Sequence, residues 1–145
     1  VSFDAFFTHI LLHELMHGLG PHDISVAGRT TTVRRELKDS YSAIEEAKAD
    51  VSGLWPLRRL VDQGHVSPAV GRSMYTTFLA SMFRSLRFGI NEAHGRGVAI
   101  QLNHFLDAGS VRVQADGRFE VVIDKMREAS TSLTAEIMTL QAEGR

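Results

Sequence analysis

The sequence predicts a mainly helical domain with one small β-hairpin near residues 111–122. Two patterns lead to this fold class. Apolar residues recur at intervals of three and four in several long segments, the spacing that gives a helix one buried face. Alternation of apolar and polar residues, which is typical of strands, appears on either side of the turn-forming pair Asp116-Gly117.

The first predicted helix covers residues 2–16. Ser2 is a suitable N-cap, and the glycines and proline of 18–21 end the helix. Helical spacing predicts a broad buried face on this helix, made by Phe3, Phe6, Phe7, Ile10, Leu11 and Leu12. After it, the polar residues 22–32 around Gly28 indicate a loop or a short hairpin.

The second long helix is predicted over residues 41–60, after a short helix over 34–39. Pro56 lies inside it and should kink the helix or split it in two, because proline removes a backbone donor. Three more helices complete the predicted domain, over 67–86, 91–106 and 124–142.

The composition excludes several kinds of partner and site. The formal net charge is −1, from 16 basic and 17 acidic residues, so the basic excess of a nucleic-acid-binding surface is missing. There is no cysteine, so any metal must be held by histidine or carboxylate side chains. No apolar run approaches the roughly 20 residues that span a bilayer. We therefore expect neither nucleic acid nor a membrane as a partner.

The start of the chain predicts a piece of a longer protein. The chain begins with Val1, and the next residues are strongly apolar without the order of a signal peptide. We expect residues 1–145 to form a single domain that is the C-terminal, metal-binding part of a longer cytoplasmic protein.

The pentapeptide HELMH is the first of two motifs that carry chemistry. Residues four apart lie on one face of a helix, so His13 and His17 can bind one ion. Glu14 projects to the side, where its carboxylate can act as general base on a metal-bound water. A catalytic zinc needs a third protein ligand, and in this chain that ligand must be a histidine or a carboxylate.

The stretch EEAKAD supplies candidates for that third ligand. Glu46 and Asp50 lie four residues apart on one face of the second long helix. Glu46 can therefore bind the metal while Asp50 accepts from the free ring N–H of a ligand histidine. Glu45 points about 100° away from Glu46 around the helix axis and can accept from the other histidine. The alternative is that Glu45, Glu46, Lys48 and Asp50 form a solvated helix face.

HELMH followed by EEAKAD resembles the zinc-binding motif pair of the dipeptidyl-peptidase III family. The likeness is greatest to its bacterial and plant zinc-hydrolase relatives, some of which are joined to Nudix domains. It covers roughly residues 5–105. The resemblance implies a zincin-like helical catalytic domain in which His13, His17 and Glu46 bind Zn²⁺ and Glu14 is the base.

The resemblance also implies roles for residues around the ion. Glu45 and Asp50 would be the hydrogen-bonding partners of the ligand histidines. His94, in the stretch NEAHGRG, would stabilise the transition state. The family enzyme has a separate lobe that contributes substrate contacts, so an N-terminal lobe of the same protein is an implied partner.

Several other histidines and arginines each have two possible roles. His9, one turn before HELMH, is interpreted as a core or capping histidine, with a position in the cleft as the alternative. His22 is a candidate for the cleft rim. Arg84, Arg87 and Arg96 can bind a substrate carboxylate, although arginines on helix faces are mostly surface salt-bridge partners.

We predict a zinc-dependent hydrolase, most simply a metallopeptidase that acts on a peptide or another small carbonyl substrate. Two alternatives remain open. One is a thermolysin-like zincin of other specificity, because Glu-x-x-x-Asp also resembles that group's third-ligand motif. The other is a non-catalytic zinc-binding or regulatory module of a larger protein. Exposed apolar surface at the junction with another lobe would favour self-association, so a homodimer is a further hypothesis.

Overall fold

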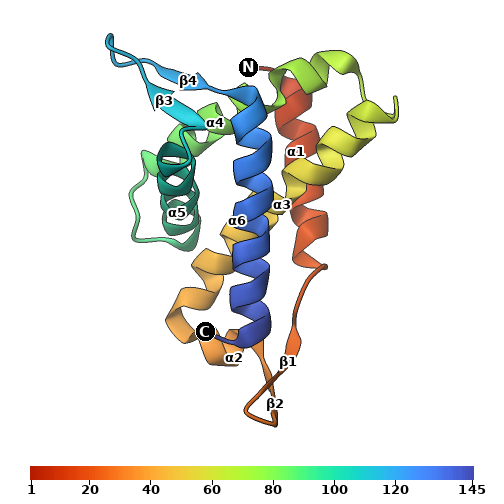
Figure 1. Ribbon diagram of the computed structural model, residues 1–145, viewed down its shortest axis with the longest axis vertical. Helices are drawn as coiled ribbons and strands as arrows, with labels where there is room; N and C mark the ends of the chain where they lie inside the picture. The colour runs from red at the N-terminus through yellow and green to blue at the C-terminus, as the bar shows by residue number, and fades with distance from the viewer.

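The computed structural model describes residues 1–145, and Figure 1 shows their arrangement. The elements follow in the order α1 (Phe3–His17), β1 (Asp23–Val26), β2 (Arg29–Thr32), α2 (Val33–Leu37), α3 (Tyr41–Asp62), α4 (Pro68–Leu86), α5 (Ala93–Asp107), β3 (Val111–Val113), β4 (Phe119–Val121) and α6 (Ile123–Glu143). A 3₁₀ turn, Lys38–Ser40, joins α2 to α3. The predicted fold class, mainly helical with a small hairpin near residues 111–122, is confirmed. None of the helices combines the length and the apolar character needed to cross a bilayer.

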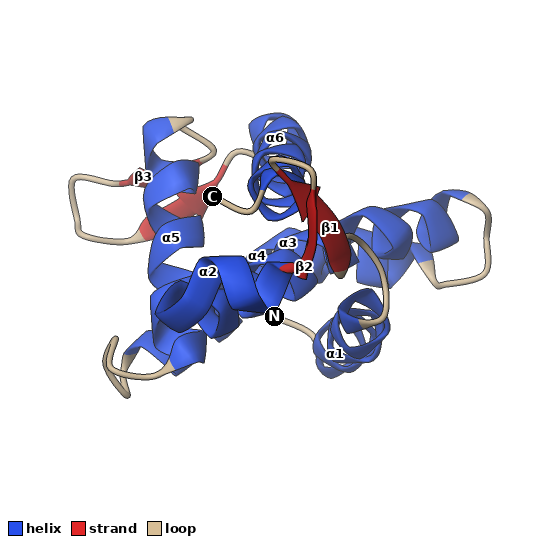
Figure 2. Ribbon diagram, turned by 90° about the horizontal axis from the view of Figure 1, so that it is seen from below, coloured by secondary structure: helices blue, strands red, loops and turns tan.

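Helix α3 is the central element of the fold. It packs against α1, α4, α5 and α6, which lie on different sides of it in Figures 1 and 2. Val51 of α3 joins one core cluster with Phe78 of α4 and Phe105 of α5. Because the central helix contacts all the others, its residues are placed with little freedom.

Helix α3 continues through Pro56, so the predicted split does not occur. Proline removes one backbone donor from the helix. Leu54 and Leu57, on either side of it, are 1% and 0% exposed. Their core contacts hold the helix together across the missing hydrogen bond.

Helix α1 has the predicted extent but not the predicted burial. Ser2 caps it, since its Oγ accepts a hydrogen bond from the backbone N–H of Ala5 at 3.4 Å. The buried residues of the helix are Ala5, His9, Leu12 and His13. Phe3, Phe7 and Leu11, expected on the buried face, are 75%, 58% and 53% exposed. That expectation was wrong because α1 turns its histidines, rather than its most apolar stripe, toward α3.

Two antiparallel hairpins complete the fold. β3 pairs with β4 at the predicted place, with Val113 opposite Phe119. β1 pairs with β2, so residues 22–32 form a hairpin rather than a loop. Its two central residues, Ala27 and Gly28, both have positive φ, as the tightest hairpin turns require. The hairpin comes between α1 and α3 in the sequence and lies at the bottom of the molecule in Figure 1, where α1 and α3 run in opposite directions.

Candidate metal centre

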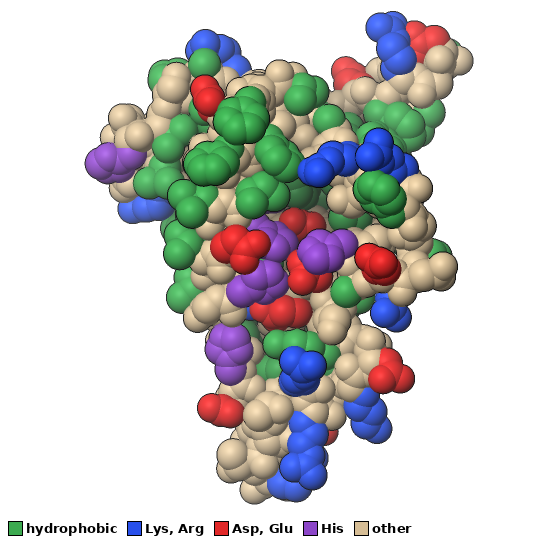
Figure 3. Space-filling model, turned by 180° about the vertical axis from the view of Figure 1, so that it is seen from behind, with side chains coloured by type: hydrophobic (Ala, Val, Ile, Leu, Met, Phe, Trp, Pro, Cys, Tyr) green, Lys and Arg blue, Asp and Glu red, His purple; other side chains and the backbone are tan.

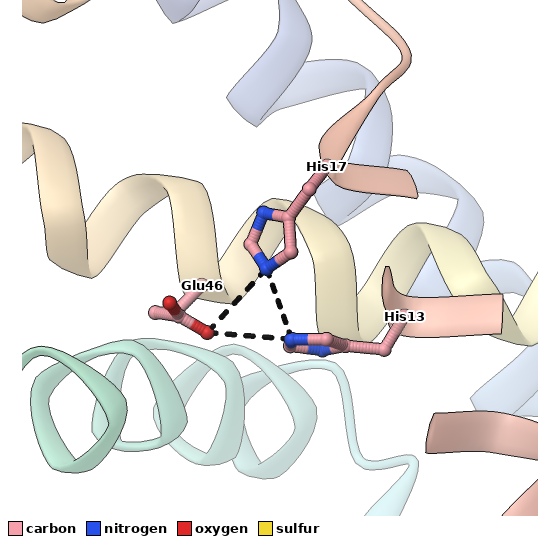
Figure 4. Close-up of side chains that lie close together, drawn as sticks. All are labelled: His13, His17 and Glu46. Atoms are coloured by element: carbon pink, nitrogen blue, oxygen red, sulfur yellow. Dashed lines mark hydrogen bonds and ion pairs between the residues drawn. The ribbon is translucent and has the colours of Figure 1, made fainter. Parts of the chain in front are cut away.

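The two sequence motifs meet where α1 packs against α3. His13 and His17 extend from α1 and Glu46 extends from α3 toward one point, as Figure 4 shows. One ligand atom from each lies within 4.8 Å of the other two. Nε2 of His13 is 3.1 Å from Nε2 of His17 and 3.4 Å from Oε2 of Glu46. Nε2 of His17 is 3.8 Å from the same oxygen.

These separations fit a tetrahedral zinc ion. Ligand atoms bound at tetrahedral angles about 2.0–2.1 Å from zinc lie about 3.3 Å from each other. The three side chains would fill three corners and leave the fourth open. Oε2 of Glu46 is buried and has no hydrogen-bond partner, although the nearest Nε2 atoms, those of His94 and His13, are 3.1 and 3.4 Å away. A bound cation would satisfy this buried oxygen.

Carboxylates hold the far side of both imidazole rings. Nδ1 of His13 lies 2.8 Å from Oδ1 of Asp50, and Nδ1 of His17 lies 3.1 Å from Oε1 of Glu45. If each Nδ1 carries a proton and donates it, the Nε2 lone pairs face the common point between His13, His17 and Glu46. This is the arrangement in which ligand histidines are oriented by hydrogen-bonding partners.

The charges around His13 favour a cation at this point. Burial lowers the pKa of His13, but its hydrogen bond with Asp50, its close contact with Glu46 and the negative charges of both carboxylates outweigh burial and raise that pKa to about 10. Burial raises the pKa of Glu46, yet His13, His94 and His17 bring it below its ordinary value. A proton on His13 thus satisfies the carboxylates as a metal cation would. A divalent ion at this point would displace that proton, so metal binding would release a proton.

The two carboxylates behind the histidines are themselves held. Oδ2 of Asp50 accepts from Nε2 of Gln101 at 3.0 Å. Oε1 of Glu45 lies 2.7 Å from Nζ of Lys48, whose side chain is 0% exposed. Oε2 of Glu45 accepts from Nε2 of Gln141 at 2.8 Å. These contacts fix the carboxylates, and through them the imidazole rings, from α3, α5 and α6.

None of these three residues was predicted to support the site. Lys48 was considered only as part of a solvated helix face, and that alternative is wrong because its side chain is fully buried. Lys48 could have been found, because it follows Glu45 by three residues within the second motif, a spacing at which helix side chains meet. Gln101 and Gln141 carry no such pattern. Amide side chains on helices are ordinarily exposed, and only the packing of α5 and α6 against α3 places both at 0% exposure.

A cleft of about 200 Å³ opens beside His13, which lines it together with Glu14 and His94. His94 is 66% exposed, and its Nε2 lies 3.1 Å from Oε2 of Glu46. Gly97 explains how α5 brings His94 there. A Cβ at position 97 would lie 2.8 Å from the carbonyl oxygen of Ala43, so only glycine allows α5 this close to α3.

The structure brings together all the residues predicted for the site, and their individual roles stay predictions. Figure 3 shows histidine and acidic side chains gathered in the middle of one face, with hydrophobic side chains next to them. His9 is buried, and its Nε2 lies 2.8 Å from the carbonyl oxygen of Asp50. It occupies the core position that was favoured and also lines the cleft. His22 is exposed and is not among the residues that line the cleft.

Comparisons with known proteins agree with this fold. No protein-family model matches the chain. It is similar to dipeptidyl-peptidase III from Corallococcus sp. strain EGB, with 69% identity and a TM-score of 0.96, over 99% of this chain and 27% of that one. It is also similar to DPP III from Caldithrix abyssi, with 43% identity and a TM-score of 0.95, over 99% of this chain and 28% of that one. Nudix hydrolase 3 of Arabidopsis thaliana is 48% identical over 99% of this chain and 19% of its own length.

The resemblance predicted from the two motifs is therefore confirmed. The chain has the fold of a segment that makes up about a quarter of each dipeptidyl-peptidase III structure. The segment that matches Nudix hydrolase 3 is 19% of that protein, so its name does not describe this chain.

Proposed function

We propose that this chain, whose sequence and fold match a segment of dipeptidyl-peptidase III, is the zinc-binding part of a hydrolase, most simply a metallopeptidase. His13, His17 and Glu46 would be the ligands. One observation carries the proposal: two Nε2 atoms and one orphan carboxylate oxygen lie 3.1–3.8 Å apart, close to the spacing of three corners of a zinc tetrahedron.

A zinc ion held there would supply a Lewis acid that lowers the pKa of a coordinated water and polarises a carbonyl group. The chain's own residues would do the rest. Glu14 is exposed beside His13 and lines the cleft, so its carboxylate can accept a proton from the attacking water. His94 lines the same cleft and can donate to the carbonyl oxygen as that oxygen gains negative charge.

The substrate in this proposal is a peptide or another small carbonyl compound. The chain spans 27% and 28% of the two peptidase structures that it matches. We therefore propose that further substrate contacts come from an N-terminal lobe of the same protein. Activity measurements accordingly belong on the natural full-length protein, whereas metal binding can be measured on this chain.

Zinc content is the first test. Elemental mass spectrometry on the purified chain should find one zinc per chain, lost or strongly weakened in Glu46→Ala. The loss should exceed the roughly 10- to 100-fold that is typical when a hydrogen-bonding partner of a ligand is removed. Asp62→Ala is the matched control, since Asp62 lies on the same helix and pairs with Arg58 at the surface. Equal zinc in Glu46→Ala and wild type would contradict the ligand assignment.

The base assignment has a separate test. Glu14→Ala in the zinc-loaded full-length protein should abolish peptide hydrolysis while leaving the metal content unchanged. Undiminished hydrolysis in this variant would exclude Glu14 as the base. Zinc bound by His13, His17 and Glu46 without hydrolysis of any peptide would favour the non-catalytic module instead.

A further inference from the structure

The cleft beside the candidate ligands contains a fixed positive charge that the proposed chemistry does not use. Its walls come from α1, α3, α4 and α5, and Arg84 of α4 is the only arginine or lysine among the lining residues. The guanidinium of Arg84 lies over the ring of Phe6, 5.6 Å from its centroid, and forms no ion pair. A free guanidinium in a cleft that also holds Glu14 and His94 is placed to meet a substrate rather than a neighbouring helix.

The structure separates Arg84 from the two arginines that the sequence put beside it. Arg87 lies over Phe88, 4.6 Å from the ring centroid, and does not line the cleft. Arg96 is exposed on α5 and does not line it either. Position in the cleft therefore distinguishes Arg84 from its neighbours, which sequence spacing alone could not do.

We propose that Arg84 binds a carboxylate of the substrate at the end of the cleft that is distant from the candidate ligands. The proposal rests on the proposed function and adds a substrate class to it. A guanidinium binds a carboxylate through two parallel hydrogen bonds. That of Arg84 lies over the ring of Phe6, which leaves its edge free for such a pair. Glu14 lines the cleft beside His13 and repels a carboxylate there, whereas Arg84 attracts one.

The spacing of residues along α1 indicates how far that carboxylate lies from the candidate ligands. Phe6 precedes His13 by two helical turns, which is roughly 10 Å along the axis. An extended peptide advances about 3.3 Å per residue, so the carboxylate would lie about three residues from the carbonyl that is attacked. It comes from the C-terminus of a short peptide or from an acidic side chain. Ile10 and Val98 line the cleft between the two ends and offer apolar contact to the residues in between.

Peptide binding tests the proposal without depending on turnover. Calorimetry on the zinc-loaded full-length protein carrying Glu14→Gln would compare two peptide pairs. One pair differs by a free or amidated C-terminus, and the other by an internal glutamate or glutamine. With Arg84→Met added, the carboxylate-bearing member of one pair should bind about 10- to 100-fold more weakly, the usual value of a hydrogen bond to a charged group. Its neutral counterpart should change by no more than about twofold.

Two control variants, one at Arg87 and one at Arg84 itself, test whether the effect belongs to the guanidinium of Arg84. Arg87→Met should leave all affinities unchanged, and Arg84→Lys, which keeps the charge without the planar fork, should fall between wild type and Arg84→Met. The pair that responds identifies the source of the carboxylate. An equal loss for charged and neutral peptides, or no preference in the protein with Arg84 intact, would overturn the proposal. The proposed function can also fail separately. If the protein with Glu14 intact hydrolyses no peptide but still prefers carboxylate-bearing peptides through Arg84, the proposed function is overturned and the carboxylate site at Arg84 is not.

Discussion

The two sides of α1 have opposite relations between polarity and burial. On the side toward α3, His9 and His13 are 5% and 6% exposed. On the outer side, Phe7, Leu11 and Leu15 are 58%, 53% and 57% exposed. An ordinary amphipathic helix buries its apolar stripe and exposes its polar one. α1 departs from this pattern, because two of its four buried residues are histidines and these three large apolar side chains are exposed.

The difference shows that hydrogen-bond partners, rather than hydrophobicity, decide which side of α1 packs. Burying a polar group without a hydrogen-bond partner costs several kcal/mol, and a hydrogen bond inside the protein removes much of that cost. On the inner side, the rings of His9 and His13 both find one in Asp50. Burial lowers the pKa of His9 and so favours its neutral form, which is cheaper to bury. The outer apolar side chains contribute little to the folding of this chain, because they stay in water.

The largest loss of stability is expected from a change at Lys48, a residue of α3 behind the polar side of α1. Its ammonium group is fully buried between Oε1 of Glu45 and the carbonyl oxygen of Leu19, each 2.7 Å away. Lys48→Met leaves the buried Glu45 carboxylate without its cation, so the free energy of unfolding should fall by about 3–5 kcal/mol. Denaturant titration measures this change.

Two further variants make the Lys48 test decisive. Replacing both partners, Lys48→Met with Glu45→Leu, removes the uncompensated charge and should cost less than Lys48→Met alone. Lys125→Met, at an exposed position of α6, should change stability by no more than about 0.5 kcal/mol. A double variant less stable than the single one would show that the Lys48 side chain stabilises by packing and not by charge.

The second prediction compares neighbours in the sequence. Leu12 is 6% exposed and belongs to the core cluster, whereas Leu11 is 53% exposed. Leu12→Ala should reduce the free energy of unfolding by about 2–5 kcal/mol, and Leu11→Ala by no more than about 0.5 kcal/mol. Equal losses in denaturant titrations of the two variants would mean that the outer side of α1 is covered in solution, by self-association or by another part of the protein.

Local rules in the sequence were enough for the elements and for the motif pair. The extents of α1 and α5 follow from apolar spacing and end signals, and the Asp116-Gly117 turn marks the second hairpin. HELMH and EEAKAD meet because α1 and α3 run in opposite directions. What failed was the orientation of α1, since periodicity counts apolar residues and is blind to a buried partner such as Asp50 on another helix.

The contacts behind the site depend on packing that local rules do not contain. Gln141 reaches Glu45 from a helix that lies 96 residues away in the sequence, and Gln101 reaches Asp50 across 51 residues. Neither glutamine stands in a motif. In the same way, the close approach of α5 at Gly97, which brings His94 to Glu46, is visible only once α3 and α5 are packed.

The third prediction concerns what the inner side of α1 is for. Asp50→Asn keeps the shape of the side chain but removes the charge that orients His13. Its Oδ1 can still accept from Nδ1 of His13, while its new N–H group points toward Nε2 of Gln101, also a donor. Zinc affinity, measured by competition with a chromogenic chelator, should fall about 10- to 100-fold, or about 1.4–2.7 kcal/mol. Asp62→Asn, on the same helix but at the surface, should bind zinc as the wild type does. If Asp50→Asn also bound zinc normally, the polar side of α1 would serve packing alone, and the contrast between the two sides of the helix would have no connection with the metal.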